Sequence, residues 1–368
     1  MIGFVQSLIT IVLFILILGG LVIIHELGHF VTARLSGVRV LEFGIGFPPR
    51  AKVLRARGET LYTLNWLPIG GFVKLEGEDG SDADDPRSFT AQGLPKKLTI
   101  LVAGVAMNVV LAFVIFTGIT WLASPYVGVK FFEVQPNSPA AAAGLQPGDA
   151  IIAVDGQRYQ FVTGPNALTD LRERAGKTVS LTVVGPTGSR RDVPVTLRSA
   201  AEIDAQKGAL GISGANKPFE GFFYGEYTQN DLATAVTVGA DQTTRWMGLI
   251  VGGLASLVGS VAANPTAPPP VAGPIGIATQ IGDIFWNSGP IMTLYVAGIL
   301  SANLAVVNIL PFPPLDGGRM LMITLKRIFG TRISLRAEQL TYVVGFVFLF
   351  AFIIWVTGFD IIRSLGGG

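Results

Sequence analysis

Four long apolar runs limit what this chain can fold into. They cover residues 8–24, 98–123, 290–310 and 342–356. A helix needs about 20 apolar residues to cross a bilayer. Half of the 368 residues are hydrophobic and only 14% are charged, whereas a soluble domain carries about 25% charge. We therefore predict a multi-pass α-helical membrane protein with four transmembrane helices.

The basic residues set the expected orientation. Lys and Arg are concentrated at residues 34–97, between the first two runs, and at 319–336, between the last two. Only Arg363 follows the final run. By the positive-inside rule both loops are cytoplasmic, so the termini and the long middle region lie outside. The N-terminus lacks the basic start and cleavage site of a signal peptide, and we expect the first helix to be retained.

The composition excludes some functions. The net charge is only +2, and no zinc-finger or phosphate-loop spacing occurs, so we predict no nucleic-acid partner. The chain has no Cys, which excludes disulfides and thiolate metal sites.

The sequence HELGH stands at the end of the first apolar run and contains both histidines of the chain, His25 and His29. Four residues apart, they share one face of a helix. The pattern H-E-x-x-H binds zinc through its two His and uses its Glu, here Glu26, as general base toward water. The alternative is a pair of buried histidines satisfied by hydrogen bonds. Ionisable groups inside a transmembrane helix are costly and usually functional, which favours the metal.

Such a zinc site needs a third protein ligand, and no His is left. The third apolar run leads into NILPFPPLDGG, where Asp316 is the only nearby acid. The three prolines there end the helix, and Gly317 and Gly318 permit close backbone approach. The alternative is an ordinary cytoplasmic turn. For Asp316 to meet His25, one transmembrane helix alone must separate their two helices. The Gly-rich run 246–263 must then not cross, and we predict an amphipathic helix that lies in the outer interface or packs on the core.

These motifs resemble the site-2 protease family of intramembrane zinc metalloproteases, and among them the bacterial regulator-of-sigma-E type. HELGH, FGIGF, PIGGFVKL and NILPFPPLDGG occur in the expected order. The resemblance implies one Zn²⁺ per chain on His25, His29 and Asp316, with Glu26 as catalytic base. It also implies that Asn308 contacts the substrate backbone. Asn108 is a further candidate substrate contact, because it matches an Asn of the family's second helix. Val105 replaces the usual Pro nearby, and Asn108 is equally consistent with helix packing.

The first cytoplasmic loop is expected to form membrane-associated β-hairpins. Residues 38–77 alternate β-branched and aromatic residues around Gly and Pro turns. A protease must receive its substrate unwound, and a strand edge can hold an extended peptide. We assign this role to 43–47 or 70–75, with Gly44, Gly46, Gly71 and Phe72 as candidate contacts. A purely structural hairpin is the alternative. The acidic run 76–86 is assigned no chemistry.

The middle region has soluble composition and resembles a single PDZ domain of α+β type inserted outside the membrane. Residues 134–157 predict a strand, a short Ala helix, a Pro-Gly turn, a strand and an Asp-Gly hairpin turn. Its function is peptide binding by strand addition, or size filtering without a pocket. The stretch 263–274 predicts a stiff linker, and the following GPIGI segment suggests no mechanism.

The predicted organisation has seven parts. They are a first transmembrane helix with the zinc motif (1–35), a hairpin loop (36–97), a second transmembrane helix (98–124), a PDZ-like domain (126–213), a linker with an interfacial helix (214–288), a third transmembrane helix with the Asp ligand (289–318) and a fourth transmembrane helix (340–362).

The predicted function is cleavage of single-span proteins near the cytoplasmic side of a bacterial inner membrane. The resemblance implies that the substrates are membrane-bound anti-sigma factors already cut once by another protease, or remnant signal peptides. It also implies that membrane lipid surrounds the protein. The alternative is a non-catalytic scaffold that uses the PDZ-like domain to bind partners. A zinc transporter would need more polar residues in its helices. The sequence predicts no oligomeric state.

Overall fold

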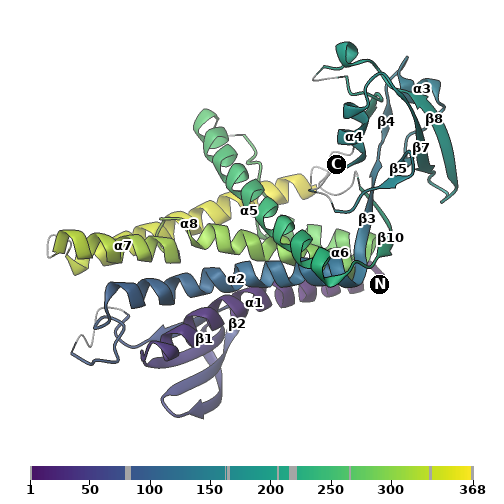
Figure 1. Cartoon of the computed structure of the whole chain (residues 1–368). Coiled ribbons are helices and arrows are strands. Elements are labelled where there is room, and N and C mark those ends of the chain that lie inside the picture. The colour runs from purple at the N-terminus through teal and green to yellow at the C-terminus, as the bar shows by residue number, and fades with distance from the viewer. Residues whose placement is uncertain are drawn as a thin grey trace. The chain divides into compact units, whose positions relative to one another are not determined.

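The computed structural model describes residues 2–78, 84–161, 163, 166–204, 207–214, 222–264, 267–330 and 334–365. Residues 79–83 of the acidic run and 215–221 of the expected linker lie outside this description. The chain forms two compact units (Figure 1). The helical unit comprises Met1–Phe116 with Thr243–Gly368, and the sheet unit comprises Thr117–Gln242.

Within the described part of the chain, five helices are long and apolar enough to cross a membrane. They are α1 (Ile2–Leu35), α2 (Leu94–Ala123), α5 (Leu232–Ala263), α6 (Pro274–Asn308) and α8 (Leu335–Leu365). Four of them match the four predicted runs, although the third run extends two residues beyond the end of α6. The fifth, α5, contains the run that we expect not to cross. Large apolar side chains such as Leu16 and Phe348 point outward, as lipid-facing residues do.

Small residues bring the helices of the helical unit together. A Cβ on Gly28 of α1 would stand 2.4 Å from the carbonyl oxygen of Ala103 in α2. A Cβ on Gly298 of α6 would stand 2.8 Å from the Phe116 ring of α2. Helices in lipid associate through close contact at small residues. The hydrophobic effect does not drive this association, because the acyl chains are as apolar as the side chains. The result is a tight contact of α2 with both α1 and α6.

Helix α6 starts earlier than the sequence indicated. It begins at Pro274, after Gly273 as N-cap, and runs through the Gly289–Pro290 step where the apolar run begins. Gly289 has φ 80° and ψ −177°, so the helix is kinked there into two parts. A Gly-Pro pair is typical of a helix boundary. Despite the Gly-Pro pair, the residues before Gly289 are also helical, so a first helical part precedes the apolar run.

Asp360 of α8 holds the start of α6. Its carboxylate accepts from the backbone N–H of Gly273 (3.2 Å) and of Gly276 (2.8 Å). A Cβ on either glycine would lie 2.8 Å from a carboxylate oxygen. The nearby Arg363 donates to the carbonyl of Pro269 at 2.5 Å. The two glycines of the GPIGI segment therefore admit a buried carboxylate to a helix N-terminus, which it stabilises electrostatically.

Two long strands, β1 (Val40–Arg57) and β2 (Thr60–Leu75), follow α1 and form the predicted hairpin. Both are bent, so each contributes two segments to the sheet. Gly44 pairs with Phe72 on one side and with Thr63 on the other. The order across the sheet is 50–57, 60–65, 42–45 and 71–75. Among the described residues no strand pairs with the outer side of 71–75, which is therefore an open edge.

The sheet unit is built on one antiparallel sheet with strand order β10-β3-β5-β7-β8 and with β6 beside β5. These strands are β3 (Ser124–Lys130), β5 (Ala150–Val154), β6 (Gln157–Arg158), β7 (Thr178–Val184), β8 (Arg190–Thr196) and β10 (Phe222–Thr228). A separate pair joins β4 (Glu133–Val134) to β9 (Ile212–Ser213). The helices are α3 (Pro139–Ala142), α4 (Ala167–Glu173) and the 3-10 turn Ala200–Glu202.

The elements predicted over 134–157 appear in that order in the sheet unit. Helix α3 has Ser138 as N-cap, and Asp155 and Gly156 both have positive φ in the turn after β5. The unit extends beyond the predicted boundaries 126–213 because β10 pairs with β3 and adds a strand to the sheet. The relation of this unit to PDZ domains stays a prediction.

Candidate active site

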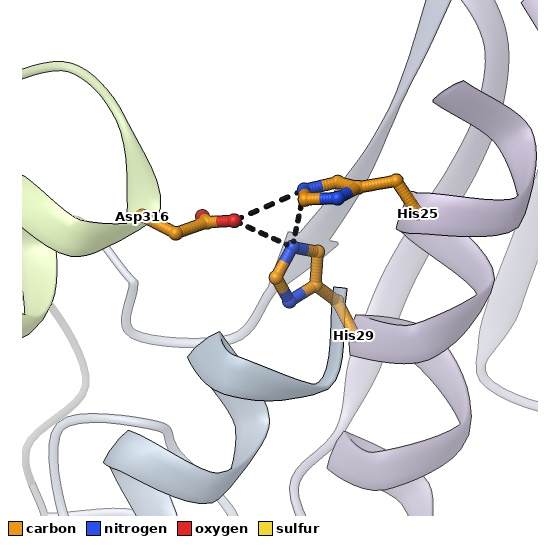
Figure 2. A group of neighbouring side chains, drawn as sticks. All are labelled: His25, His29 and Asp316. Atoms are coloured by element: carbon orange, nitrogen blue, oxygen red, sulfur yellow. Dashed lines mark hydrogen bonds and ion pairs between the residues drawn. The ribbon is translucent and has the colours of Figure 1, made fainter. Parts of the chain in front are cut away.

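Two helices bring three potential metal ligands together (Figure 2). Helix α1 presents His25 and His29 on one face, and Asp316 is the first residue of α7 (Asp316–Phe329). The Oδ2 atom of Asp316 lies 3.0 Å from His25 Nε2 and 3.3 Å from His29 Nε2. The two Nε2 atoms lie 3.1 Å apart. Both imidazoles are buried.

The spacing of these atoms fits a cation. Ligands about 2.0–2.1 Å from a tetrahedral zinc ion lie about 3.3 Å from one another. The buried Oδ2 of Asp316 has no hydrogen-bond donor. The Nδ1 of His29 lies 2.8 Å from the carbonyl oxygen of Ile100 and donates its proton there, which leaves the lone pair on Nε2. Lone pairs that converge in this way repel one another unless a cation lies between them.

One face of α2 forms the wall behind the two imidazoles. Ile100, Gly104 and Asn108 are spaced four residues apart on this face. Ile100 supplies the carbonyl for His29, and the Asn108 amide lies 3.2 Å from His25 Nδ1. A Cβ on Gly104 would stand 2.4 Å from His29 Nε2. This face thus supplies the Ile100 carbonyl and the Asn108 amide as polar partners. Between them, Gly104 has no side chain and leaves space for the two rings.

Glu26 follows His25 directly and is not part of the three-ligand group. It interacts electrostatically with His25, His29 and Asp316. Its Cγ would lie 3.6 Å from a Cβ on Gly71, so the open edge of β2 passes beside this carboxylate. A carboxylate next to the ligands but free of them is placed to exchange a proton with water.

Asp316 begins a helix, rather than lying in the ordinary cytoplasmic turn that was the alternative. The backbone folds tightly before it: a Cβ on Gly317 would stand 2.1 Å from the carbonyl oxygen of Ile309, and one on Gly318 2.5 Å from the carbonyl carbon of Phe312. The close approach expected of the two glycines is therefore present. It turns the chain from the end of α6 into α7 and directs the carboxylate toward α1.

Arg319, one turn after Asp316, pairs with Glu78 at the end of the hairpin, Nη1 to Oε1, at 2.5 Å. Burial acts to lower the pKa of Arg319, but the carboxylates of Glu78 and Asp316 outweigh it and hold that pKa above its ordinary value. The charged pair joins the start of α7 to the end of β2.

The candidate substrate contacts lie in three places. Gly44 and Gly46 belong to β1, and Gly44 lies in a segment that is paired on both sides. Gly71 and Phe72 belong to the open edge of β2. Asn308 is the last residue of α6 and is partly buried. Of the two predicted hairpin segments, 43–47 and 70–75, the second includes the edge 71–75, which no described strand pairs on its outer side and which lies beside Glu26.

Three residues at the site were not identified from the sequence: Ile100, Gly104 and Arg319. Ile100 acts through its backbone carbonyl, which every residue type has, so the sequence cannot identify it. Gly104 stands four residues before Asn108, and this helical spacing was an available signal. Arg319 stands three residues after Asp316 on the same face of a helix, but α7 itself was not predicted.

Comparison with known proteins decides the family. A sequence profile described as peptidase family M50 matches residues 13–352. The chain belongs to peptidase family M50. This is the site-2 protease family that the motifs indicated. Relatives named as zinc metalloproteases align with the chain over nearly its full length.

A predicted zinc metalloprotease of Clostridium perfringens is 31% identical over 348 residues, 95% of this chain and 97% of the relative. Another from Clostridium acetobutylicum is 32% identical over 368 residues, 98% of this chain and 99% of the relative. The zinc metalloprotease RasP of Geobacillus kaustophilus is 27% identical over 441 residues, 97% of this chain and 99% of the relative.

Proposed function

We propose that the protein is an intramembrane zinc endopeptidase that holds one zinc ion on His25, His29 and Asp316. It would cut single-span membrane proteins within or near their transmembrane segment. Membership of a family of zinc metalloproteases supports the reaction class. The observation that carries the proposal is the convergence of three ligand atoms, all within 4.8 Å of one another, on two helices of an apolar bundle.

When bound, zinc supplies a Lewis acid that polarises a peptide carbonyl and makes water a stronger acid. Glu26 accepts a proton from the attacking water and delivers it to the leaving amine, so it ends each cycle as it began. His25, His29 and Asp316 fix the metal at the end of α1. The surrounding apolar side chains exclude bulk water, which strengthens the electrostatic interactions of the site.

The edge of β2 is the proposed holder of the unwound substrate. An intact helix satisfies its own backbone groups and hides the scissile bond, so the substrate must become extended before it is cut. The segment 71–75 has an unpaired side and passes Glu26 at Gly71. Main-chain pairing with Gly71 and Phe72 would hold an extended substrate there. Asn308, at the end of α6, is a second proposed contact with the substrate backbone.

We propose four membrane crossings, by α1, α2, α6 and α8. His25 lies near the C-terminal end of α1, and Asp316 follows the C-terminal end of α6. Their contact requires α1 and α6 to run in the same direction. With α2 crossing between them, a single crossing by α5 would reverse α6. We therefore place α5 at the outer interface, with the termini and the PDZ-like domain outside and the zinc site toward the cytoplasm.

The absence of Cys makes this topology testable by single-cysteine labelling of intact cells with an impermeant thiol reagent. Thr187→Cys in the β7–β8 turn should label directly, and Lys52→Cys in the hairpin only after permeabilisation. Gln229→Cys and Ala267→Cys flank α5 and should both label directly. Labelling of Gln229→Cys and Ala267→Cys from opposite sides would mean that α5 crosses, and the four-crossing topology would be wrong.

For substrates we propose membrane-bound anti-sigma factors after a first cut, with remnant signal peptides as a second class. The PDZ-like domain would then screen outer segments by peptide binding or by size. Both proposals rest on the family resemblance.

The deciding experiment uses the purified full-length protein in detergent. Bound zinc is measured in wild type, Asp316→Ala and Glu26→Gln, together with cleavage of a single-span model substrate. We expect about one zinc per chain in wild type, loss of zinc in Asp316→Ala, and a zinc-loaded but inactive Glu26→Gln. Zinc retained by Asp316→Ala would exclude the third ligand. Cleavage by Glu26→Gln at the wild-type rate would exclude Glu26 as the base.

A further inference from the structure

Asn108 is fully buried in α2, and its contacts point to a role that differs from substrate binding. Its side-chain Nδ2 lies 3.2 Å from His25 Nδ1. Its Oδ1 is buried and has no hydrogen-bond partner. Its main-chain carbonyl accepts from the Ser301 hydroxyl of α6 at 2.8 Å. The residue is thus held between three helices, with one polar atom unsatisfied beside an imidazole.

His25 needs an acceptor at this position. Its Nε2 faces His29 and Asp316, and a neutral imidazole that ligates metal through Nε2 carries its proton on Nδ1. An amide can present either its oxygen or its nitrogen, because a half turn about the last side-chain bond exchanges them. With Oδ1 toward His25, the amide accepts the Nδ1 proton. That arrangement gives both the unpartnered oxygen and the imidazole N–H a partner, and it turns Nδ2 to the position where Oδ1 has none.

We propose that Asn108 is a positioning residue for His25: its amide oxygen accepts from Nδ1 and fixes the tautomer and ring plane in which Nε2 can bind zinc. The Ile100 carbonyl does the same for His29. One face of α2 therefore orients both imidazoles, through a side chain for one and the backbone for the other. The inference rests on the proposed zinc site.

Burial separates this role from substrate contact. Asn108 exposes none of its surface, whereas a residue that binds an incoming peptide must be reachable from the substrate path. Partners of a ligating histidine tune metal affinity, and their loss typically weakens it about 10–100-fold. The two roles therefore predict different measurements: Asn108 as a positioning residue changes zinc affinity, and Asn108 as a substrate contact changes KM alone.

The test compares full-length wild type, Asn108→Leu and Asn108→Asp in detergent. Leu keeps the approximate volume without an acceptor, and Asp restores one. Zinc affinity is measured by competition with a chelator, the absorption spectrum is recorded with cobalt in place of zinc, and kcat and KM are measured at saturating zinc. We expect Asn108→Leu to bind zinc about 10–100-fold more weakly with an altered cobalt spectrum. Asn108→Asp should restore affinity and spectrum toward wild type.

Ser301→Ala is the matched control, because it removes a hydrogen bond to Asn108 without touching the amide group. It should keep wild-type zinc affinity. If Asn108→Leu does not fold, Asn108→Ala takes its place, with cooperative thermal unfolding as the criterion. Wild-type zinc affinity with a raised KM in Asn108→Leu would establish substrate contact and overturn the inference. Wild-type zinc affinity, cobalt spectrum, kcat and KM in Asn108→Leu would mean that Asn108 serves only in helix packing, and this would also overturn the inference. A wild type that binds no zinc would instead refute the proposed function.

Discussion

Gly104 of α2 lies so close to His29 of α1 that a Cβ at position 104 would stand 2.4 Å from the ring Nε2. The same Cβ would lie 2.8 Å from His25 Cε1. The two imidazoles fill the space that any other residue at position 104 would need. A helix backbone is therefore part of the wall of the proposed zinc site.

Gly104→Ala should displace both imidazoles. Both rings are buried and held by α2, so they can make room for the Cβ only by leaving their hydrogen-bonded positions. A displacement of about 1 Å costs on the order of a hundredfold in rate, so we expect at least that loss of cleavage together with reduced zinc occupancy. Metal analysis and a cleavage assay check both. Gly118→Ala is the control on the same helix, since a Cβ there meets nothing within 4 Å. Full zinc and activity in Gly104→Ala would contradict the packing described.

Asp360→Ala should destabilise the helical unit. Removal of the carboxylate leaves the N–H groups of Gly273 and Gly276 without their acceptor. Each buried unsatisfied group costs about 1–3 kcal/mol, so we expect the two to cost about 2–6 kcal/mol, measured by thermal unfolding in detergent. Gly358→Ala, two residues away on α8 in open space, should unfold like wild type. Equal melting temperatures for Asp360→Ala and wild type would show that Asp360 does not hold α6.

Reversal of one charge in the Arg319–Glu78 pair should loosen the start of α7 from the hairpin. Each single variant, Arg319→Glu or Glu78→Arg, places like charges in contact at partly buried positions. We expect each to lose about 1–3 kcal/mol of stability and part of its zinc occupancy. The double variant restores opposite charges and should recover both. A double variant as impaired as the sum of the singles would mean that the pair has no specific role.

The sheet unit should lose stability in acid through Asp170. Burial acts to raise the pKa of this carboxyl, but hydrogen bonds from Arg174 and Tyr159 outweigh it and hold the pKa below its usual range. An unfolded Asp has a pKa of about 3.9. The stabilisation is therefore complete above about pH 4 and is lost as the pH falls through the lower folded pKa.

Asp170→Asn should remove this pH dependence and about 1–2 kcal/mol at neutral pH. Hydrogen exchange of α4 amides in the full-length protein, corrected for the intrinsic pH dependence of exchange, measures both. Asp192→Asn serves as control, because Asp192 is exposed and accepts from the Thr182 hydroxyl on the neighbouring strand. If Asp170→Asn still loses stability as the pH falls, other carboxyl groups cause the pH dependence.

Local patterns predicted the elements that depend on nearby residues. The four-residue spacing of His25 and His29 follows from helix geometry alone. Asp316 was found because the zinc motif lacked a third ligand and this carboxylate was the only candidate at the end of an apolar run. The hairpin and the Asp155–Gly156 turn likewise follow from short-range residue preferences.

Features that depend on distant backbone were not predicted. The role of the Ile100 carbonyl cannot be inferred from the residue type, because every residue has a backbone carbonyl. The start of α6 at Pro274 is determined by a carboxylate more than eighty residues later, at Asp360. The pairing of Gly44 on both sides arises from bends in β1 and β2 that no alternation pattern specifies. Each of these requires contacts between segments far apart in the sequence.

The distribution of ligands along the chain has a consequence for biosynthesis. His25, Glu26 and His29 leave the ribosome with the first helix, whereas Asp316 is made more than 280 residues later. Until then the nascent chain carries two imidazoles and a carboxylate without the proposed third ligand. With the proposed ligand set, a peptidase assembled in this order would not act on other nascent membrane proteins while it is itself incomplete, and a prematurely terminated chain would be inert.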